Sequence, residues 1–325
     1  MLDHSFNGPP FTIGIEEELM LLDAETFLPA PASHLLVGET DAGTLKTELH
    51  ASVIELATPV CRDVGEAAAS LRELRLEAAA RAAEHGVVIA AGGAHPTAAI
   101  DSLPIVQEER YLSMIDELGY VARRQAVNGL HVHVGMESLD ACWDRFESVL
   151  GWLPAVLAVS CNSPFFDGVD TGMLSNRAGV LAELPRAGAP PEFASYADWE
   201  AWVERLASLG VIEDYTRLWW DVRPHPRLGT LEIRIADQPT SPARTELIVQ
   251  LVSDLVERVP SQVTPRGDYL QNRWAAARWG TDAQLIHPDG SRMVGVGELL
   301  GFDPPAPEAL ERRSASELVA ETLRF

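Results

Sequence analysis

The sequence predicts an α+β fold in which a largely antiparallel sheet carries its helices on one side. Segments with strand periodicity occur singly and in pairs between helical segments of irregular spacing, so the strand–helix rhythm of a doubly wound parallel sheet is missing. Hydrophobic residues make up 46% of the chain and charged residues 22%, as is typical of folded globular proteins. The 325 residues contain no internal repeat and no long linker, so we expect one domain over residues 1–325.

Three segments of the N-terminal half have strand character and two have helical character. Pro59 ends the second strand segment, which looks extended only in part. Asp63 is suited to cap the first helix, and Gly86 stands just past its end. The strands are expected at residues 11–22, 44–58 and 87–91, and the helices at residues 63–85 and 103–118.

The C-terminal half continues with short strands between longer helices. Pro154 is expected to break or kink the first of these helices. A polar loop covers residues 161–180, and the Pro/Gly-rich residues 184–191 form a surface loop rather than a domain boundary. The strands are expected at residues 130–136, 218–222 and 230–236, and the helices at residues 138–160, 196–209, 241–259 and 269–279.

The charge of the chain argues against two classes of partner. With 25 basic and 48 acidic residues the formal net charge is −23, so we expect neither a nucleic-acid nor a membrane partner. An anionic small substrate would need local cations or a bound metal to overcome this charge. Lys46 is the only lysine, and the other basic residues are arginines.

The cysteines and apolar segments indicate a reduced, cytoplasmic protein. Cys61, Cys142 and Cys161 form an odd set without CxxC spacing, which fits neither a disulfide framework nor a zinc–thiolate site. Residues 1–10 lack the basic and apolar regions of a signal peptide. The longest apolar stretch, residues 149–161, is too short to span a bilayer.

The first chemically distinctive segment is the expected strand that carries Glu16 and Glu18. Side chains alternate between the faces of a strand, so these carboxylates share one face with Gly14. Two neighbouring carboxylates repel each other unless a cation lies between them, and a hard divalent cation is the usual solution. A solvated acidic edge strand explains the pair equally well. Glu17 falls on the apolar face, where the pattern gives no reason for it.

A second acidic segment covers residues 45–58. Lys46, Glu48 and His50 share one face if this segment is extended. Glu55 lies within an apolar run, where a carboxylate is expected to be paired or to bind a metal. Pairing with an arginine would explain Glu55 without a metal, and Lys46 could equally be an ordinary surface residue.

The expected strand at 130–136 presents two histidines. His131 and His133 share a face with Gly135, and such an HxH strand commonly offers two imidazoles to one site. Hydrogen bonding of both rings within the sheet is the less favoured explanation.

Arginines stand beside carboxylates in two later strands. Glu232 and Arg234 share one face, and Asp221 and Arg223 share a face in the same way. A carboxylate beside a guanidinium suits a site for a metal and a phosphate, although a salt bridge explains each pair alone. The polar groups of loop residues 160–177 could bind a substrate or hydrogen-bond to one another.

The chain lacks the P-loop, the Rossmann glycine fingerprint and the GxSxG motif. Acidic strands, an HxH strand and arginine-bearing strands together favour a phosphate site with several cations on an antiparallel sheet. The alternative is a metal-dependent amide hydrolase that uses the HxH and carboxylate set. A hydrolase of neutral amides would not need Arg223 and Arg234.

Seven segments in this order resemble the bacterial carboxylate–amine ligase family, also called glutamate–cysteine ligase type 2. They cover nearly all of residues 11–300 and read GIEEEL, LKTELHASVIELATPVCRD, AAGGAHP, ERY, NGLHVHVG, NSPFFDGVDTGMLSNR and WWDVRPHPRLGTLEIRIAD. The family is similar to the wider glutamate–cysteine ligase and glutamine synthetase superfamily. The resemblance therefore implies a curved, mostly antiparallel sheet that forms a funnel, with helices packed outside.

The resemblance implies an ATP-dependent ligase that activates a carboxylate as an acyl phosphate before an amine displaces phosphate. It implies ATP and two or more Mg²⁺ ions, or Mn²⁺, as cofactors. Small amino acid and amine substrates such as glutamate and cysteine are implied, and a homodimer is compatible with it. The implied magnesium ligands are Glu16, Glu18, Glu48, Glu55, His131 and Glu232.

The remaining implied roles concern the phosphoryl group, the nucleotide and the substrates. Arg234 is implied to stabilise the transferring phosphoryl group, with Arg223 as a second catalytic residue. His133 and Lys46 are implied to contact the nucleotide or a metal. Substrate contacts are expected from Asn162, Ser163, Arg177 and Trp220.

Two features depart from the family pattern. Glu17 stands where some members have an apolar residue. The chain ends at Phe325 after the Pro-rich stretch GFDPPAPE, and this C-terminus looks short for the family. A catalytically silent relative is a third hypothesis, against which the intact set of Glu, His and Arg residues argues.

Overall fold

The computed structural model describes residues 2–311, so the chain end at Phe325 lies outside the described part. Eight strands form one open sheet in the order β11–β12–β6–β1–β4–β3–β2, and β5 pairs with the far end of β1. All of these pairings are antiparallel, which confirms the predicted fold class. The strands are β1 (Ile13–Asp23), β2 (Gly38–Thr40), β3 (Gly43–Thr47), β4 (Val53–Ala57), β5 (Val87–Ala90), β6 (Gly129–Gly135), β11 (Val222–His225) and β12 (Thr230–Asp237).

Strand β1 is the long central strand and has partners on both edges. It pairs with β6 along residues 13–17 and with β4 along residues 16–20. It then pairs with β5 along residues 20–23. Because β4 overlaps both of the other registers, β6 and β5 share one edge of β1, with Glu18 and Leu19 in the interval between them.

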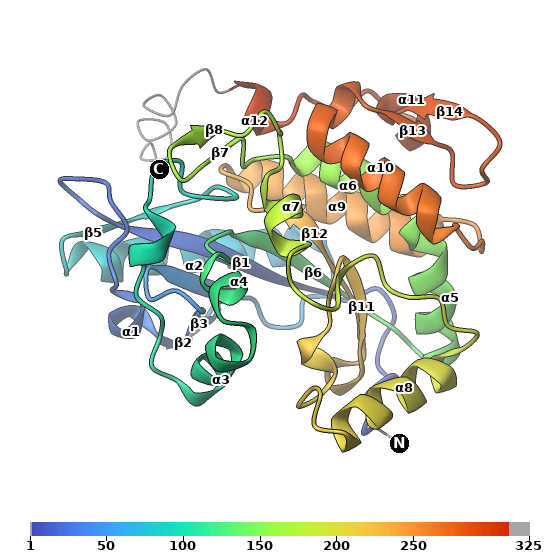
Figure 1. The fold of residues 1–325 in the computed structure, drawn as a ribbon, viewed down its shortest axis with the longest axis horizontal. Helices are drawn as coiled ribbons and strands as arrows, with labels where there is room; N and C mark the ends of the chain where they lie inside the picture. The colour runs from blue at the N-terminus through green and yellow to red at the C-terminus, as the bar shows by residue number, and fades with distance from the viewer. Residues whose placement is uncertain (1, 312–325) are drawn as a thin grey trace.

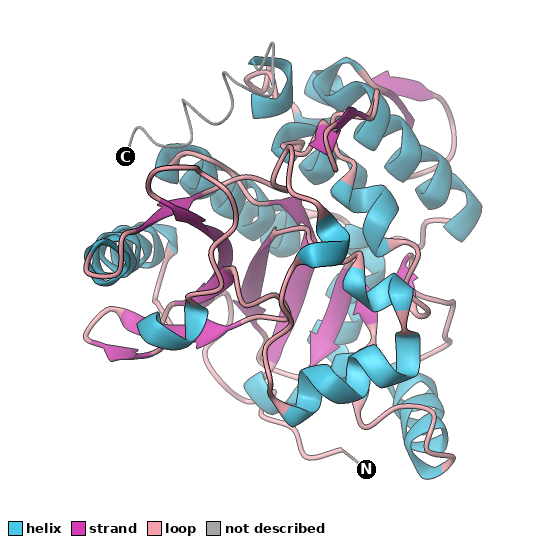
Figure 2. Ribbon diagram, turned by 60° about the vertical axis from the view of Figure 1, so that its left-hand side comes forward, coloured by secondary structure: helices cyan, strands magenta, loops and turns pink. Residues whose placement is uncertain are grey.

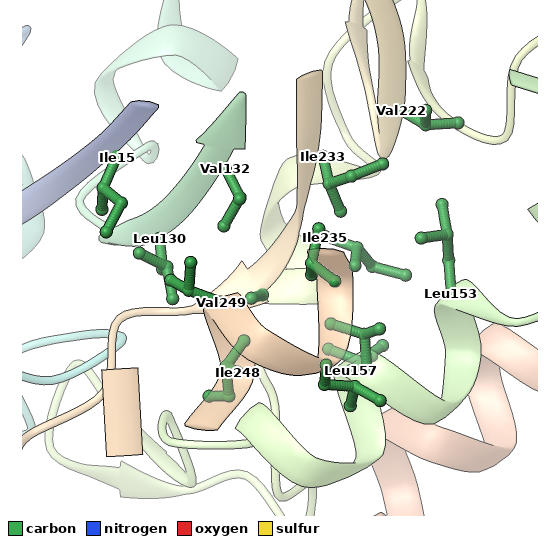
Figure 3. Packing of buried hydrophobic residues seen from close by; sticks show 14 of the residues in the cluster. Ile15, Leu130, Val132, Leu153, Leu157, Val222, Ile233, Ile235, Ile248 and Val249 are labelled. Atoms are coloured by element: carbon green, nitrogen blue, oxygen red, sulfur yellow. The ribbon is translucent and has the colours of Figure 1, made fainter. Parts of the chain in front are cut away.

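Helices cover one face of the sheet. Figure 1 shows α6, α9 and α10 gathered together, and Figure 2 shows the strands at the centre of the molecule with helices around them. In Figure 3, Ile15, Leu130 and Val132 of the sheet face Ile248 and Val249 of α9. The principal helices on this face are α2 (Val64–Ala83), α5 (Leu139–Leu150), α6 (Leu153–Ser160) and α9 (Pro242–Arg258), and α10 (Arg266–Trp279) packs against α6.

The remaining elements are short or peripheral. Parts of α3 and α7 border the opposite, polar face of the sheet. The helices are α1 (Ser33–Leu36), α3 (Glu109–Leu118), α4 (Tyr120–Arg123), α7 (Arg177–Leu181), α8 (Tyr196–Ser208), α11 (Val296–Leu300) and α12 (Glu308–Glu311). Three two-stranded sheets join β7 (Phe165–Phe166) to β8 (Val169–Asp170), β9 (Ala187–Gly188) to β10 (Trp219–Trp220), and β13 (Gln284–Ile286) to β14 (Met293–Gly295).

Two boundaries differ from the predicted ones. The extended segment expected at residues 44–58 is a hairpin, with residues 48–52 in the turn between β3 and β4. The helix expected from residue 103 begins only at Glu109. The preceding residues instead pair with this turn, because Ala51 N donates to the Pro104 carbonyl and Val106 N donates to the Leu49 carbonyl.

Two further elements are interrupted where one continuous element was predicted. The helix expected at 138–160 breaks at Gly151 and Trp152, with Pro154 in the first turn of the second helix. The strand expected at 218–222 divides at Asp221 into β10 and β11. None of the helices within residues 2–311 has both the length and the apolar character of a membrane span.

Candidate active site

The strand register brings the predicted polar residues together on the face of the sheet opposite the helices. Arg223 of β11 pairs with Glu232 of β12, which pairs in turn with His133 of β6. Glu16 of β1 stands opposite His131 of β6. A third row joins Glu18 of β1 to Glu55 of β4 and Lys46 of β3.

A cleft of about 610 Å³ lies over these rows. Segments outside the sheet, including parts of α3, α7 and residues 213–219, complete its walls. Eleven of the predicted site residues line it: Glu16, Glu18, Lys46, Glu48, Glu55, His131, His133, Arg177, Arg223, Glu232 and Arg234.

Glu16, His131 and Glu232 form a compact group of donors. One ligand atom from each lies within 4.8 Å of the others, and Glu16 Oε2 is 3.4 Å from His131 Nδ1. Burial favours a raised pKa for Glu16, but the imidazoles of His131 and His133 hold it well below its usual range. Burial likewise opposes ionisation of Glu232, yet Arg223 and Arg234 keep its pKa well below the usual range. Both carboxylates are therefore anionic at neutral pH.

Glu18, Glu48 and Glu55 form a second acidic group beside the first. Burial, together with Glu18 and Glu55, raises the pKa of Glu48 to about 8. Burial and Glu16 raise the pKa of Glu55 to about 7, against the opposing charge of Lys46. Lys46 Nζ lies 3.0 Å from Glu55 Oε1 and 3.9 Å from Glu16 Oε1. Lys46, the only lysine of the sequence, thus offsets part of the negative charge of this acidic group.

The donors in both groups fit divalent cations. Carboxylate oxygens are the preferred ligands of Mg²⁺ and Mn²⁺, and an imidazole is acceptable to Mn²⁺. His133 Nε2 is buried and lacks a hydrogen-bond partner within residues 2–311, while it lies 3.7 Å from Glu16 Oε2. His133 Nδ1 meets Thr230 Oγ1 at 2.9 Å, which orients the ring with Nε2 toward this group. A divalent cation would satisfy this nitrogen and relieve the repulsion between the carboxylates.

The two predicted catalytic arginines have different surroundings. Arg223 donates from Nε to Glu232 Oε2 at 2.8 Å, and from Nη1 to the carbonyls of Thr216 and Leu218 at 2.8 and 2.9 Å. Protein acceptors thus occupy its guanidinium, which holds Glu232 in place. Arg234 contacts the other oxygen of Glu232 and lies 3.5 Å from His131 Nδ1. Arg234 is therefore the better placed of the two to meet a ligand.

Arg177 sits in a close-fitting position above β6. Its guanidinium donates to the carbonyls of Arg234 and Ile235 at 3.1 and 3.3 Å, although the residue is only 3% exposed. A Cβ on Gly129 would lie 2.8 Å from Arg177 Cζ, so only glycine leaves room for this guanidinium. The arrangement places a buried cation at the wall of the cleft.

The structure does not bring three of the predicted substrate residues to the cleft. Asn162 and Ser163 instead bind Asp237, through the Asn162 N–H at 2.8 Å and the Ser163 hydroxyl at 2.7 Å. Trp220 is 1% exposed and stacks on Trp202, while its neighbour Trp219 lines the cleft.

Asp221 also differs from the prediction, because it does not share a face with Arg223. Its carboxylate accepts hydrogen bonds from Arg273 Nε and Tyr269 OH of α10, both at 2.6 Å. The division between β10 and β11 at this residue breaks the expected alternation.

Several cleft residues escaped the sequence analysis. Arg110 and Tyr111 belong to the ERY segment, which carried resemblance but no assigned role. Arg217, His225 and Arg227 come from the segment around the turn RPHPRLG. The basic residues of this turn directly precede the strand that carries Glu232 and Arg234, and this position could have indicated from the sequence that they lie near the site.

Comparisons with known proteins identify the family of this chain. A family model described as glutamate–cysteine ligase family 2 (GCS2) matches residues 12–315. A protein of Rubrobacter xylanophilus named putative glutamate–cysteine ligase 2-3 is 38% identical over 322 residues, covering 97% of this chain and 84% of that one. A protein of Haloferax volcanii named glutamate–cysteine ligase is 38% identical over 299 residues, covering 88% of this chain and 83% of that one.

A solved structure shares the fold. The crystal structure of a glutamate–cysteine ligase from Francisella tularensis in complex with AMP superposes with a TM-score of 0.67 at 13% identity, covering 99% of this chain and 82% of that one. The sequence matches settle the family more strongly than this fold likeness does. The chain therefore belongs to glutamate–cysteine ligase family 2, whose members are ATP-dependent carboxylate–amine ligases.

Proposed function

We propose that this ligase activates the carboxylate of an amino acid, with glutamate as the first candidate, and joins it to cysteine or another small primary amine. The single observation that carries the proposal is the strand register, which sets two groups of carboxylates against one cleft that Arg234 also lines. ATP, bound with divalent cations, supplies the phosphoryl group that converts the carboxylate to an acyl phosphate from which the amine displaces phosphate.

Two groups of side chains would hold the divalent cations. The first consists of Glu16, His131 and Glu232, whose ligand atoms already lie within 4.8 Å of one another. The second consists of Glu18, Glu48 and Glu55, which crowd together with Lys46 as their nearby cation. His133 pairs with Glu232 and lies 3.7 Å from Glu16 through its Nε2, which can serve a metal or a nucleotide phosphate.

The arginines act on the anionic parts of the substrates. Arg234 presents a fixed planar donor to the transferring phosphoryl group, whose negative charge is spread over its three outer oxygens during transfer. Arg223 is a positioning residue, because it holds Glu232 without facing a ligand. Arg177, buried at the wall, is suited to bind a carboxylate of the amino acid substrate.

Residues 1–325 act as one catalytic domain in this proposal, which the family match over residues 12–315 supports. We also propose a cytoplasmic location, because Cys61, Cys142 and Cys161 are buried free thiols.

The experiment is ADP release in the presence of ATP and Mg²⁺, with glutamate and cysteine added singly and together. Release that requires both, with γ-glutamylcysteine identified by mass, supports the whole proposal. Release with a different carboxylate and amine would retain the ligase mechanism and discard these substrates. Hydrolysis of an amide without any ADP would instead support the metal-dependent hydrolase.

A further inference from the structure

Glu17 is a buried carboxylate that the ligase chemistry does not use. Its side chain is fully buried and faces the helices, on the opposite side of β1 from the cleft. Arg75 of α2 donates to it from Nε and Nη2, each at 2.6 Å, and Thr245 of α9 donates from Oγ1 at 2.6 Å. Desolvation makes such a buried ion pair a poor source of net stability compared with apolar side chains of similar size. Stability alone therefore does not account for it.

The interval between β6 and β5 connects Glu17 to the cleft. On that edge of β1 the β6 register ends at Glu17 and the β5 register begins at Met20. Gln238, which directly follows β12, fills this interval, and its Oε1 accepts the N–H of Glu18 at 3.2 Å. The N–H of Glu18 is thus satisfied by a side chain, whereas residues 13–17 and 20–23 of β1 pair with a strand on this edge.

Glu17 determines which way the Gln238 amide points. Gln238 Nε2 donates to Glu17 Oε1 at 2.8 Å and to the Pro239 carbonyl at 2.9 Å. Because an ionised carboxylate only accepts hydrogen bonds, the NH₂ end must face Glu17, and this leaves Oε1 for the Glu18 N–H. Gln238 is completely buried, so it has no solvent with which to exchange these partners.

The carboxylate of Glu18 is held from the same end of the sheet. Gly129 N donates to Glu18 Oε2 at 2.5 Å, and Gly129 pairs with Asp237, the neighbour of Gln238. Backbone and side chain of Glu18 are therefore both fixed by the junction at which β6 begins and β12 ends.

We propose that Glu17 and Gln238 are positioning residues that hold the cleft carboxylate of Glu18 in a metal-binding geometry. Groups that orient metal ligands from behind commonly change metal affinity by about 10–100-fold when they are removed. This inference rests on the proposed function, because it takes Glu16 and Glu18 as metal ligands.

The test is a titration of the protein with Mn²⁺ alone, followed through the electron paramagnetic resonance signal of the free ion. Gln238→Met keeps the length of the side chain but removes both hydrogen-bonding ends. We expect it to weaken Mn²⁺ binding by about tenfold or more. Thr245→Val preserves the shape of the threonine side chain and leaves Gln238 intact, but it removes one donor to Glu17. We therefore expect it to weaken Mn²⁺ binding less than Gln238→Met does.

Asn272→Leu is the matched control. Asn272 is also a buried amide that satisfies backbone groups, since it forms two hydrogen bonds of 2.7 Å with the N–H and carbonyl of Ile286. It lies outside the cleft lining. It should lose thermal stability without losing Mn²⁺ affinity. Equal affinity in Gln238→Met and wild type, or an equal loss in Asn272→Leu, would overturn the positioning role alone. Absence of Mn²⁺ binding in the wild type would overturn the proposed metal site as well.

Discussion

Replacing Gly129 with alanine should displace Arg177 from the wall of the cleft. The added Cβ would lie 2.8 Å from Arg177 Cζ, well inside the normal separation of about 3.5–4.0 Å between carbon atoms. The φ angle of Gly129 is not in the left-handed region, so alanine adds no backbone strain of its own. The contact with Arg177 is thus the direct cause of the expected effect.

The structure also indicates the size of this effect. A displaced Arg177 loses two hydrogen bonds, to the carbonyls of Arg234 and Ile235. Hydrogen bonds from a charged donor contribute about 1.5–3 kcal/mol each, and relaxation recovers part of that. We expect the free energy of unfolding to fall by about 2–4 kcal/mol, which lowers Tm by about 3–6 °C for a chain of this length. If Arg177 binds the substrate carboxylate, KM for that substrate should rise by about tenfold, or about 1.4 kcal/mol.

Thermal unfolding and the substrate dependence of ADP release would measure the two effects. Gly179→Ala is the control, because a Cβ at Gly179 meets nothing within 4 Å and this position lies in α7. Alanine favours a helix over glycine by roughly 0.5–1 kcal/mol, so this variant should be as stable as the wild type or slightly more stable. A Gly129→Ala protein with wild-type Tm and KM would refute the reasoning.

Three further results are expected. Mg²⁺ should raise Tm beyond the shift given by a salt of equal ionic strength, since it binds the folded state; equal shifts would contradict the metal site. Arg234→Lys keeps the charge but loses the planar fork, so kcat should fall by the equivalent of about 2–4 kcal/mol, whereas an unaltered kcat would make Arg234 only an ion-pair partner. The raised pKa of Glu48, about 8, means that metal-free folded protein holds a proton which the unfolded chain releases above its ordinary value of 4.5, so stability falls as pH rises through this window. Glu48→Gln should remove that part of the fall, up to about 1.4 kcal/mol per pH unit across this window in urea unfolding, and identical pH profiles for both proteins would contradict this.

The strands of the active site could be predicted because alternation along a strand is a local property. Glu16 and Glu18, His131 and His133 were each assigned to one face from spacing alone, and the structure has them there. The register between strands is not local, since it depends on partners far apart in the chain. The pairing of His133 with Glu232, for example, joins residues from distant segments and could be expected only from the family resemblance.

Loop residues show where prediction from sequence stops. Asn162 and Ser163 have the chemistry of ligand-binding groups, but the same groups satisfy Asp237, a completely buried carboxylate. Nothing local distinguishes a hydroxyl that meets a substrate from one that meets an acid more than seventy residues later. Trp219 lines the cleft, whereas the adjacent Trp220 is buried on the other side. Alternation along one continuous strand would be needed to predict which of them faces the cleft, and the break at Asp221 interrupts that alternation.

The charge of the cleft explains how a chain with a formal net charge of −23 can take anionic substrates. Seven basic and seven acidic side chains line the cleft, so its formal charge is balanced while the excess negative charge lies elsewhere on the protein. Two divalent cations bound at the carboxylates would make this region positive by four charges. The metal sites would then serve twice, by relieving repulsion among Glu16, Glu18 and Glu55 and by attracting the phosphates of ATP and the carboxylates of an amino acid.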